Sequence, residues 1–207
     1  MGKFGVSQPV KRVEDARFLR GTGAYVEDVV WPGEARAVFV RATVAHGDLT
    51  VNASEARSAP GVLAVYTGAD LDAAVDNSLD TAPIKNRDGS RCALPRRPLL
   101  AVGRVRHVGE PVACVVADTL AAAKDAAELI VVDYEDRPAV TDTAGALAEG
   151  APLVHEDAPG NLCYDWAMGD EAATDAAFAA AARTVALDLV NNRVVANSME
   201  TRGVIAR

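Results

Sequence analysis

Three residues that could supply a nucleophile and a general base lie close together in the sequence. His107 is followed by Glu110 and then by Cys114. A histidine oriented by a carboxylate can take a proton from a thiol and so activate it for attack. Cys114, however, lies within the apolar run 111–117, and a reactive thiol needs exposure and an electropositive setting. We therefore favour a turn that leads into a strand with a core cysteine. A hydrolase or transferase using His107 and Glu110 stays open as an alternative.

Other patterns that carry chemistry are incomplete. Segment 21–23 (Gly-Thr-Gly) begins like a dinucleotide-binding loop, but Val26 stands where the third glycine is required. The sequence contains neither a phosphate-binding P-loop nor a His-Glu-x-x-His zinc motif. His46, His107 and His155 lie too far apart for a local metal site, so structural or surface roles are favoured. The residues themselves thus identify no catalytic, cofactor-binding or metal-binding group.

Composition limits the classes of protein to which the chain can belong. Of the 207 residues, half are hydrophobic and about a quarter are charged, which is the balance of a soluble globular protein with one or two domains. The net charge of −8 disfavours nucleic-acid binding. A group of arginines is expected to form a solvated face or a partner contact: Arg87, Arg91, Arg96, Arg97, Arg104 and Arg106.

The expected location follows from what the sequence lacks. It contains neither a signal peptide nor the roughly 20 consecutive apolar residues of a membrane span. The three cysteines form no Cys-x-x-Cys pair. An odd number of cysteines without an export signal favours the reducing cytoplasm. We therefore expect a cytoplasmic protein that binds neither membrane nor nucleic acid.

Local patterns predict both strands and helices in the first two thirds of the chain. Asp118 or Thr119 is expected to cap the helix 120–129, whose alanines recur at helical spacing. Because strands precede and follow this helix at once, we expect a right-handed βαβ crossover. Residues 70–98 have little periodicity and predict a long functional or contact loop. The full set of predictions is strands at 35–44, 62–67, 99–105, 111–117 and 130–134, with helices at 55–58 and 120–129.

The last third of the chain predicts a new structural unit. Residues 138–150 are expected to form a helical connector, and 162–167 a strand. Asp170 is expected to cap an alanine-rich helix that ends at Ala181. The alternation over 184–190 predicts a half-buried strand. The final residues resemble the middle of a strand, so a truncated polypeptide is expected.

Several segments, in order, resemble the large subunits of the xanthine dehydrogenase, aldehyde oxidase and carbon monoxide dehydrogenase family. The strongest match is 105–113 (VRHVGEPVA), which continues through the alanine-rich helix to 132–135 (VDYE). The others are 12–28 (RVEDARFLRGTGAYVED), 40–47 (VRATVAHG), 60–71 (PGVLAVYTGADL), 166–178 with Trp166 and Gly169-Asp170, and 199–203 (METRG).

The resemblance implies an α+β protein built from three regions. Residues 1–19 would be an amino-terminal segment, and 20–137 an α/β hammerhead domain. Residues 138–207 would be a connector and the incomplete beginning of a molybdopterin-binding domain. Family subunits are several times longer, and their cofactor loops and catalytic glutamate come later. The resemblance thus implies no catalytic, cofactor or metal ligand in this chain. Molybdopterin with its molybdenum would belong to the full-length subunit, and iron–sulfur clusters and FAD to partners.

The function implied is that of one part of a larger enzyme. The parent would be a molybdenum-dependent hydroxylase or dehydrogenase that oxidises an aldehyde, a heterocycle or carbon monoxide. This portion would be structural, would contact other subunits and would be inactive alone. The alternative within the same fold is a naturally short, non-catalytic assembly module that partners a separate cofactor-bearing chain.

The expected partners are iron–sulfur and flavin subunits or domains and the remainder of the large subunit. Loop 70–98 and segment 17–25 are the expected contacts. A fragment should also expose apolar surface where its missing part packs. Candidate residues for subunit contact, or for support beside the active site, are Arg17, Gly21, Gly23, Gly109, Glu110, Pro111, Glu200 and Arg202.

Overall fold

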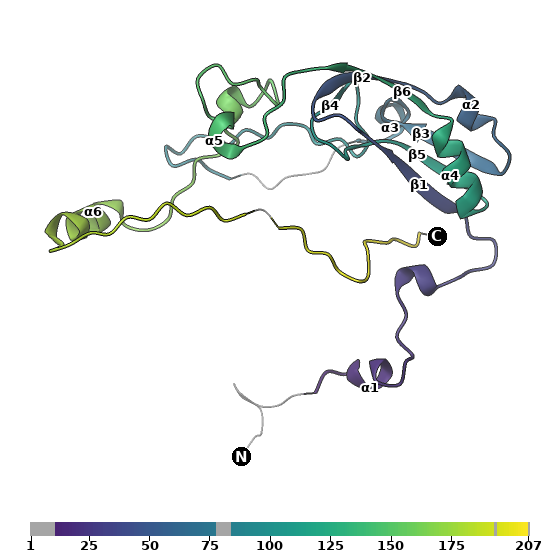
Figure 1. Cartoon of the computed structure of the whole chain (residues 1–207), viewed down its shortest axis with the longest axis horizontal. Helices are drawn as coiled ribbons and strands as arrows, with labels where there is room; N and C mark the ends of the chain where they lie inside the picture. Colours follow the sequence, from purple (N-terminus) through teal and green to yellow (C-terminus); the bar gives the residue numbers. More distant parts are fainter. Residues whose placement is uncertain (1–10, 78–83, 193, 207) are drawn as a thin grey trace. The chain divides into compact units, whose positions relative to one another are not determined.

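The computed structural model describes residues 11–77, 84–192 and 194–206. They fall into two compact units, which are described separately. The central unit is residues 35–184. The terminal unit combines the residues up to Glu34 with 185–207. The strands belong to the central unit, where they form two three-stranded sheets (Figure 1).

The first sheet, sheet A, is centred on the apolar strand β5 (Pro111–Ala117). On one side β5 pairs with β1 (Arg36–Arg41) and on the other with β3 (Val62–Thr67), both antiparallel. This confirms the strands predicted around these three segments. Alternate β5 residues on one face are fully buried, as expected for a run rich in valine and alanine at the centre of a sheet.

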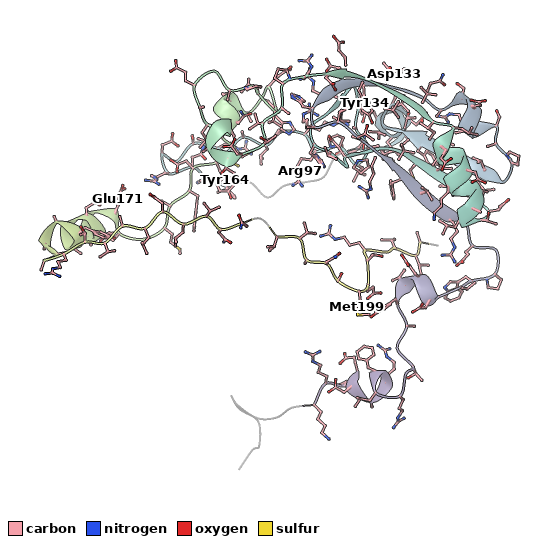
Figure 2. All side chains as sticks on the ribbon, in the orientation of Figure 1. Arg97, Asp133, Tyr134, Tyr164, Glu171 and Met199 are labelled. Carbon is pink, nitrogen blue, oxygen red and sulfur yellow. The ribbon has the colours of Figure 1, made fainter. Side chains whose placement is uncertain are left out.

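The second sheet, sheet B, is centred on β2 (Gly47–Asn52). It pairs antiparallel with β4 (Arg104–Val105) and with β6 (Val131–Asp136). Strand β6 alternates between half-buried and exposed side chains: Tyr134 packs against the core while its neighbour Asp133 faces water (Figure 2). Sheet B therefore has one apolar face and one solvated face.

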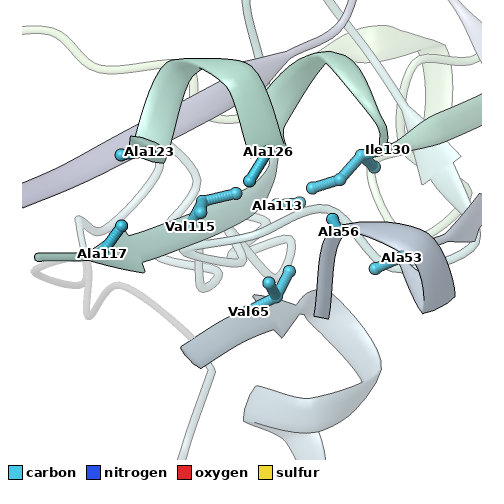
Figure 3. Close-up of a cluster of buried hydrophobic side chains, with 9 residues drawn as sticks. All are labelled: Ala53, Ala56, Val65, Ala113, Val115, Ala117, Ala123, Ala126 and Ile130. Atoms are coloured by element: carbon cyan, nitrogen blue, oxygen red, sulfur yellow. The ribbon is translucent and has the colours of Figure 1, made fainter. Parts of the chain in front are cut away.

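Helix α4 (Leu120–Glu128) covers one face of sheet A. Its first turn is capped as predicted, because the Thr119 hydroxyl accepts the Ala122 N–H at 3.1 Å. Ala123 and Ala126 are fully buried against the sheet (Figure 3). Side chains this small let the helix axis approach the strands closely, so β-branched residues of β5 fill the space between them.

The core is completed by helix α2 (Ser54–Arg57). Its Ala56 is fully buried in the same cluster as Val65 and Val115. Ala53 holds the N-cap position of α2, and the Asn52 side chain accepts the Ser54 N–H at 3.1 Å. A second, smaller cluster, which includes Val105 and Val112, lies under sheet B.

The predicted βαβ crossover is wrong. Strands β5 and β6 flank α4 in sequence but belong to different sheets, and every strand pair is antiparallel. The physical reason is that β1 and β3 occupy both edges of β5, so no edge remains for β6. Strand β6 pairs with β2 instead. Separate antiparallel sheets with helices against them confirm the α+β prediction.

Between residues 35 and 138, two of the described elements were not predicted. Strand β2 contains glycine, aspartate and asparagine, which have low strand propensity, and it forms because β6 pairs along its full length. Helix α3 (Gly68–Ala74) begins just before the predicted loop 70–98 and extends into it. Its Thr67 and Asp70 form a reciprocal capping box, a local signal at the required spacing. The predicted strand 99–105 shrinks to the two residues of β4.

The last third of the central unit contains little regular structure. Helix α6 (Glu171–Ala180) is confirmed, and Asp170 caps it by accepting the Ala173 N–H at 2.9 Å. The predicted connector helix is reduced to α5 (Thr143–Ala146), and a short 3-10 turn follows at Pro159–Asn161. Among the described residues, none of the helices is both long and apolar enough to cross a membrane.

The strands predicted at 162–167 and 184–190 are absent from the described structure. A strand needs a partner for its backbone, and 184–190 pairs with none of the described strands. Its alternating apolar side chains are consequently exposed: Val185 by 86%, Leu187 by 78% and Leu189 by 84%. Segment 162–167 uses its backbone differently, because Cys163 and Asp165 accept hydrogen bonds from the loop before Pro98.

The terminal unit joins the two ends of the described chain. It contains α1 (Asp15–Phe18) and a 3-10 turn at Val26–Asp28. The Glu200 carboxylate accepts the Val26 N–H at 3.0 Å, and the Thr201 hydroxyl donates to Glu27 at 3.1 Å. These two hydrogen bonds span most of the sequence and hold segment 198–203 against the turn.

Candidate functional site

The turn before β5 is tied to the end of β1. The Gly109 N–H donates to the Ala42 carbonyl at 2.8 Å, and the Ala42 N–H donates to the Glu110 carbonyl at 2.8 Å. The Arg41 guanidinium donates to the Gly109 carbonyl at 2.9 Å. Gly109 has φ +85°, which L side chains seldom adopt. Pro111 then opens β5, where its missing N–H leaves no donor unpaired.

The Glu110 carboxylate does not orient the His107 ring as a catalytic base would require. The buried Glu110 carboxylate accepts the backbone N–H of Arg106 at 2.6 Å, which fixes it within the turn. The exposed His107 ring lies 3.7 Å from that carboxylate, beyond hydrogen-bond distance. Burial raises the pKa of the Cys114 thiol, so the unreactive protonated form is favoured. This geometry supports a structural turn and weighs against the hydrolase alternative.

A charged cluster on sheet B holds the segment that follows strand β6. Asp48 accepts the Nε–H of Arg104 at 2.8 Å and that of Arg137 at 2.7 Å. The Arg104 guanidinium also donates to Glu156 at 3.0 Å. Hydrogen bonds from Arg137 and then Arg104 lower the pKa of Asp48, and Arg104 lowers the pKa of Glu156. The cluster thereby fixes 137 and 156 to the sheet by charge-assisted hydrogen bonds.

One histidine contacts the segment that follows β6, and another belongs to it. The buried His46 ring places Nδ1 2.8 Å from the Pro138 carbonyl, and the His46 carbonyl accepts the Arg137 N–H at 2.9 Å. His155 is half-buried, and desolvation followed by repulsion from Arg106 lowers its pKa. The His46 ring thereby holds the backbone at Pro138.

The open face of sheet A carries an apolar groove. Phe39, Cys114 and Tyr66 lie directly opposite one another across β1, β5 and β3. They point away from α4, and Phe39 and Tyr66 are 50% and 45% exposed. The groove has a volume of about 420 Å³. Its full lining is Phe39, Arg41, Tyr66, Leu71, Leu99, Leu100, Pro111 and Cys114.

The groove is bordered by a segment that Asn77 holds in place. Asn77 is fully buried and its side chain bonds the backbone of both Leu99 and Leu100, which line the groove. It also donates to the Gly68 carbonyl at 3.4 Å. Sequence reasoning missed Asn77, because an isolated asparagine in an aperiodic stretch carries no signal until the fold brings these backbone groups to it.

The candidate residues of the terminal unit have ordinary local roles in the structure. The Arg17 guanidinium lies 5.1 Å from the centre of the Phe18 ring, and its carbonyl accepts bonds from Thr22. Gly23 lies so close to Phe18 that an added Cβ would be 2.9 Å from the ring. Gly21 has φ +70°, while Arg202 is exposed. Of the candidates, the structure thus brings together Gly109 with Glu110 and Pro111, and joins Glu200 to Val26.

The arginines predicted to share a face behave in two ways. Arg87 pairs with Asp165 at 3.5 Å, and Arg96 pairs with Asp72 through two nitrogens. Arg106 donates to the Val154 carbonyl at 3.0 Å. Arg91 and Arg97, in contrast, are exposed and have no carboxylate within ion-pair distance in the described part of the chain.

The described side chains form no cluster of metal-binding residues. In residues 11–77, 84–192 and 194–206, no three histidine, cysteine, aspartate or glutamate side chains gather closely enough to bind a metal ion.

Most of the chain is similar to known proteins. Residues 20–138 match the family model described as "Aldehyde oxidase and xanthine dehydrogenase, a/b hammerhead domain". The carbon monoxide dehydrogenase large chain of Hydrogenophaga pseudoflava is 36% identical over 206 residues, which cover 93% of this chain and 24% of the relative. The xanthine dehydrogenase molybdenum-binding subunit of Escherichia coli O157:H7 is 36% identical over 155 residues, covering 73% of this chain and 20% of the relative.

A solved structure gives the same picture. Carbon monoxide dehydrogenase from Oligotropha carboxidovorans superposes with a TM-score of 0.66 at 35% identity. The superposition covers 86% of this chain and 23% of that chain. The chain thus spans about a quarter or less of the length of these three proteins.

Proposed function

Because the chain belongs to the aldehyde oxidase and xanthine dehydrogenase family, we propose that it serves as part of a molybdenum-dependent hydroxylase or dehydrogenase. In this proposal the chain forms a structural, subunit-contacting portion of the large subunit and is inactive alone. The parent enzyme oxidises an aldehyde, a heterocycle or carbon monoxide. The similarity to a molybdenum-binding subunit and to carbon monoxide dehydrogenase supports this assignment.

The proposed regions have different tasks. Residues 20–137 form the hammerhead domain, preceded by the segment 1–19. Residues 138–207 connect it to, and begin, the molybdopterin-binding region. The remainder of the subunit holds molybdopterin, which supplies the redox chemistry when bound. Iron–sulfur and flavin partners in the cytoplasm accept the electrons.

The observation that carries the structural role is the apolar face of sheet A that the described part of the central unit leaves exposed. A sheet with α4 on one side buries that side, whereas Phe39 and Tyr66 remain about half exposed on the other. Burying apolar area of this kind yields roughly 25 cal/mol per Å². We propose that the remainder of the large subunit packs into the groove between these two side chains. The exposed alternating residues 185–189 support the same proposal, because they pair with none of the described strands and leave apolar side chains exposed.

The first experiment measures the intact mass and molybdenum content of the protein from its native source. A longer chain with about one molybdenum per subunit supports the proposal. A 207-residue species without molybdenum that co-purifies with a separate larger chain contradicts it. That result favours a short, non-catalytic assembly module instead.

The second experiment tests the groove within the complete large subunit. Phe39→Glu places a charge on the open face of sheet A and should prevent stable assembly of the holoenzyme, seen as loss of bound molybdenum in gel filtration. Val131→Glu is the matched control, because Val131 is 52% exposed on sheet B. If the Phe39→Glu holoenzyme assembles like the control, the groove is not the docking face.

A further inference from the structure

Residues 84–92 form a short hairpin. The Cys92 N–H donates to the Ile84 carbonyl at 3.1 Å, and the Asn86 N–H donates to the Ser90 carbonyl at 2.9 Å. Lys85 and Arg91 lie between these bonds and are paired across the two arms. This is the non-hydrogen-bonded position of an antiparallel pair, in which opposite side chains approach most closely. Two cations therefore stand side by side on one face of the hairpin.

Like charges at such a position destabilise a hairpin. Both residues are exposed, and no carboxylate lies within ion-pair distance of either in the described portion of the chain. The nearby Arg87 and Arg96 each have carboxylate partners. The chain carries 29 acidic residues against 21 basic ones. Despite this excess of carboxylates, neither cation has a carboxylate partner among the residues that the structure describes.

The hairpin is nevertheless held firmly in place. The Arg87 N–H donates to the Asp165 carbonyl at 2.7 Å, and the Asp165 N–H donates to the Asn86 side chain at 3.0 Å. The Ala93 N–H donates to the Cys163 carbonyl at 2.8 Å. Within the turn, Asp88 accepts the Ser90 N–H at 2.8 Å. The two cations are therefore presented from a fixed backbone, which lowers the entropy that a partner loses on binding.

We infer that Lys85 and Arg91 form a docking site for an acidic segment of a partner protein. Carboxylates of that segment lie between the two cations and relieve their repulsion. Recognition is local, since the net charge of the chain would repel an acidic partner. The site is separate from the apolar groove and does not depend on the proposed function.

The test uses the full 207-residue chain and a fluorescein-labelled hexaglutamate peptide, with binding followed by fluorescence anisotropy. The wild type should bind at low ionic strength and release the peptide in 0.5 M salt, where the Debye length falls to about 4 Å. Lys85→Glu should weaken binding by roughly fivefold or more. The same variant should not lower the melting temperature, because it converts a like-charge pair into an opposite-charge pair.

Lys124→Glu is the matched control, since it changes the net charge equally at an exposed position on α4. It should leave peptide binding within about twofold of the wild type. The double variant Lys85→Glu, Arg91→Glu should instead bind hexalysine. The inference is overturned if the wild type shows no salt-sensitive binding, if Lys124→Glu weakens binding as much as Lys85→Glu, or if a single-stranded oligonucleotide binds more tightly than the peptide.

Discussion

The side-chain amide of Asn77 pairs with both backbone polar groups of Leu100. Its Oδ1 accepts the Leu100 N–H at 3.2 Å, and its Nδ2 donates to the Leu100 carbonyl at 3.0 Å. The same oxygen accepts the Leu99 N–H at 2.9 Å. The Asn77 side chain thus makes the hydrogen bonds that a neighbouring strand would otherwise make with the backbone of Leu99 and Leu100.

Replacing Asn77 should therefore be costly. Asn77→Ala leaves the buried backbone groups of Leu100 and the part-buried N–H of Leu99 without partners. We expect a loss of roughly 2–4 kcal/mol in the free energy of unfolding. Urea denaturation of the full chain measures it. Asn52→Ala is the control, because Asn52 bonds one exposed N–H and its loss should cost about 1 kcal/mol or less. Equal losses for the two variants would show that the Asn77 pairing is not an anchor.

Substitution by alanine should destabilise the fold more at Gly68 than at Gly109. At Gly68, an added Cβ would overlap the Ala101 carbonyl and lie 2.7 Å from Val102, so Gly68→Ala should cost roughly 3 kcal/mol or more. At Gly109 the added Cβ would meet no atom, and only its φ of +85° is unfavourable. Gly109→Ala should cost roughly 1–2 kcal/mol. Thermal denaturation ranks the two, and the reverse order would contradict the packing around Gly68.

The Asp48 cluster predicts a specific dependence of stability on pH. Hydrogen bonds from Arg137 and Arg104 lower the folded-state pKa of Asp48 below its usual 3.8. Its stabilising effect is therefore fully present above pH 3.8 and is lost as the pH falls through the folded-state pKa. Asp48→Asn should lower the melting temperature at pH 7.

The difference between wild type and Asp48→Asn should narrow once the pH falls below 3.8. Asp133→Asn, at an exposed position on β6, should change the melting temperature little at either pH. A gap between wild type and Asp48→Asn that stays constant from pH 7 to pH 3 would mean that the carboxylate charge is not what stabilises the cluster.

The three cysteines should react with iodoacetamide in a fixed order. Cys163 is exposed, Cys114 is half-buried with a raised pKa, and Cys92 is buried and accepts the Ile84 N–H at 3.2 Å. Because the thiolate is the reacting form, Cys163 should be modified first and Cys92 last. Peptide mass spectrometry over time measures the order. Fastest modification at Cys114 would reopen the interpretation of His107, Glu110 and Cys114 as a nucleophilic site.

The parts of the fold that sequence predicts are those encoded locally. The continuous apolar run of β5 and the Thr119 cap of α4 lie within a few residues of the elements that they define, and both predictions are confirmed. The pairing of β6 was predicted wrongly, because strand order depends on which distant edges remain available. Strand β2, with its Gly47 and Asp48, is recognisable only once β6 lies beside it.

The candidate site, too, could be predicted from the sequence only in part. Family resemblance identified the turn at Gly109 and Glu110, and the structure ties that turn to β1. The groove between Phe39 and Tyr66 was not foreseen, because it depends on the register across three strands from separate parts of the sequence. Its role in assembly remains a prediction, as do the roles of Arg17 and Glu200.

The packing beneath helix α4 determines how the two sheets of the central unit unfold. The cluster beneath it contains Val115 of one sheet, and partly buried Val51 and Val132 of the other pack against the same cluster. Neither sheet can expose its share of this cluster without exposing the share of its neighbour. Backbone amides of β5 and β6 should therefore exchange with deuterium in a single cooperative event, although the two strands never pair.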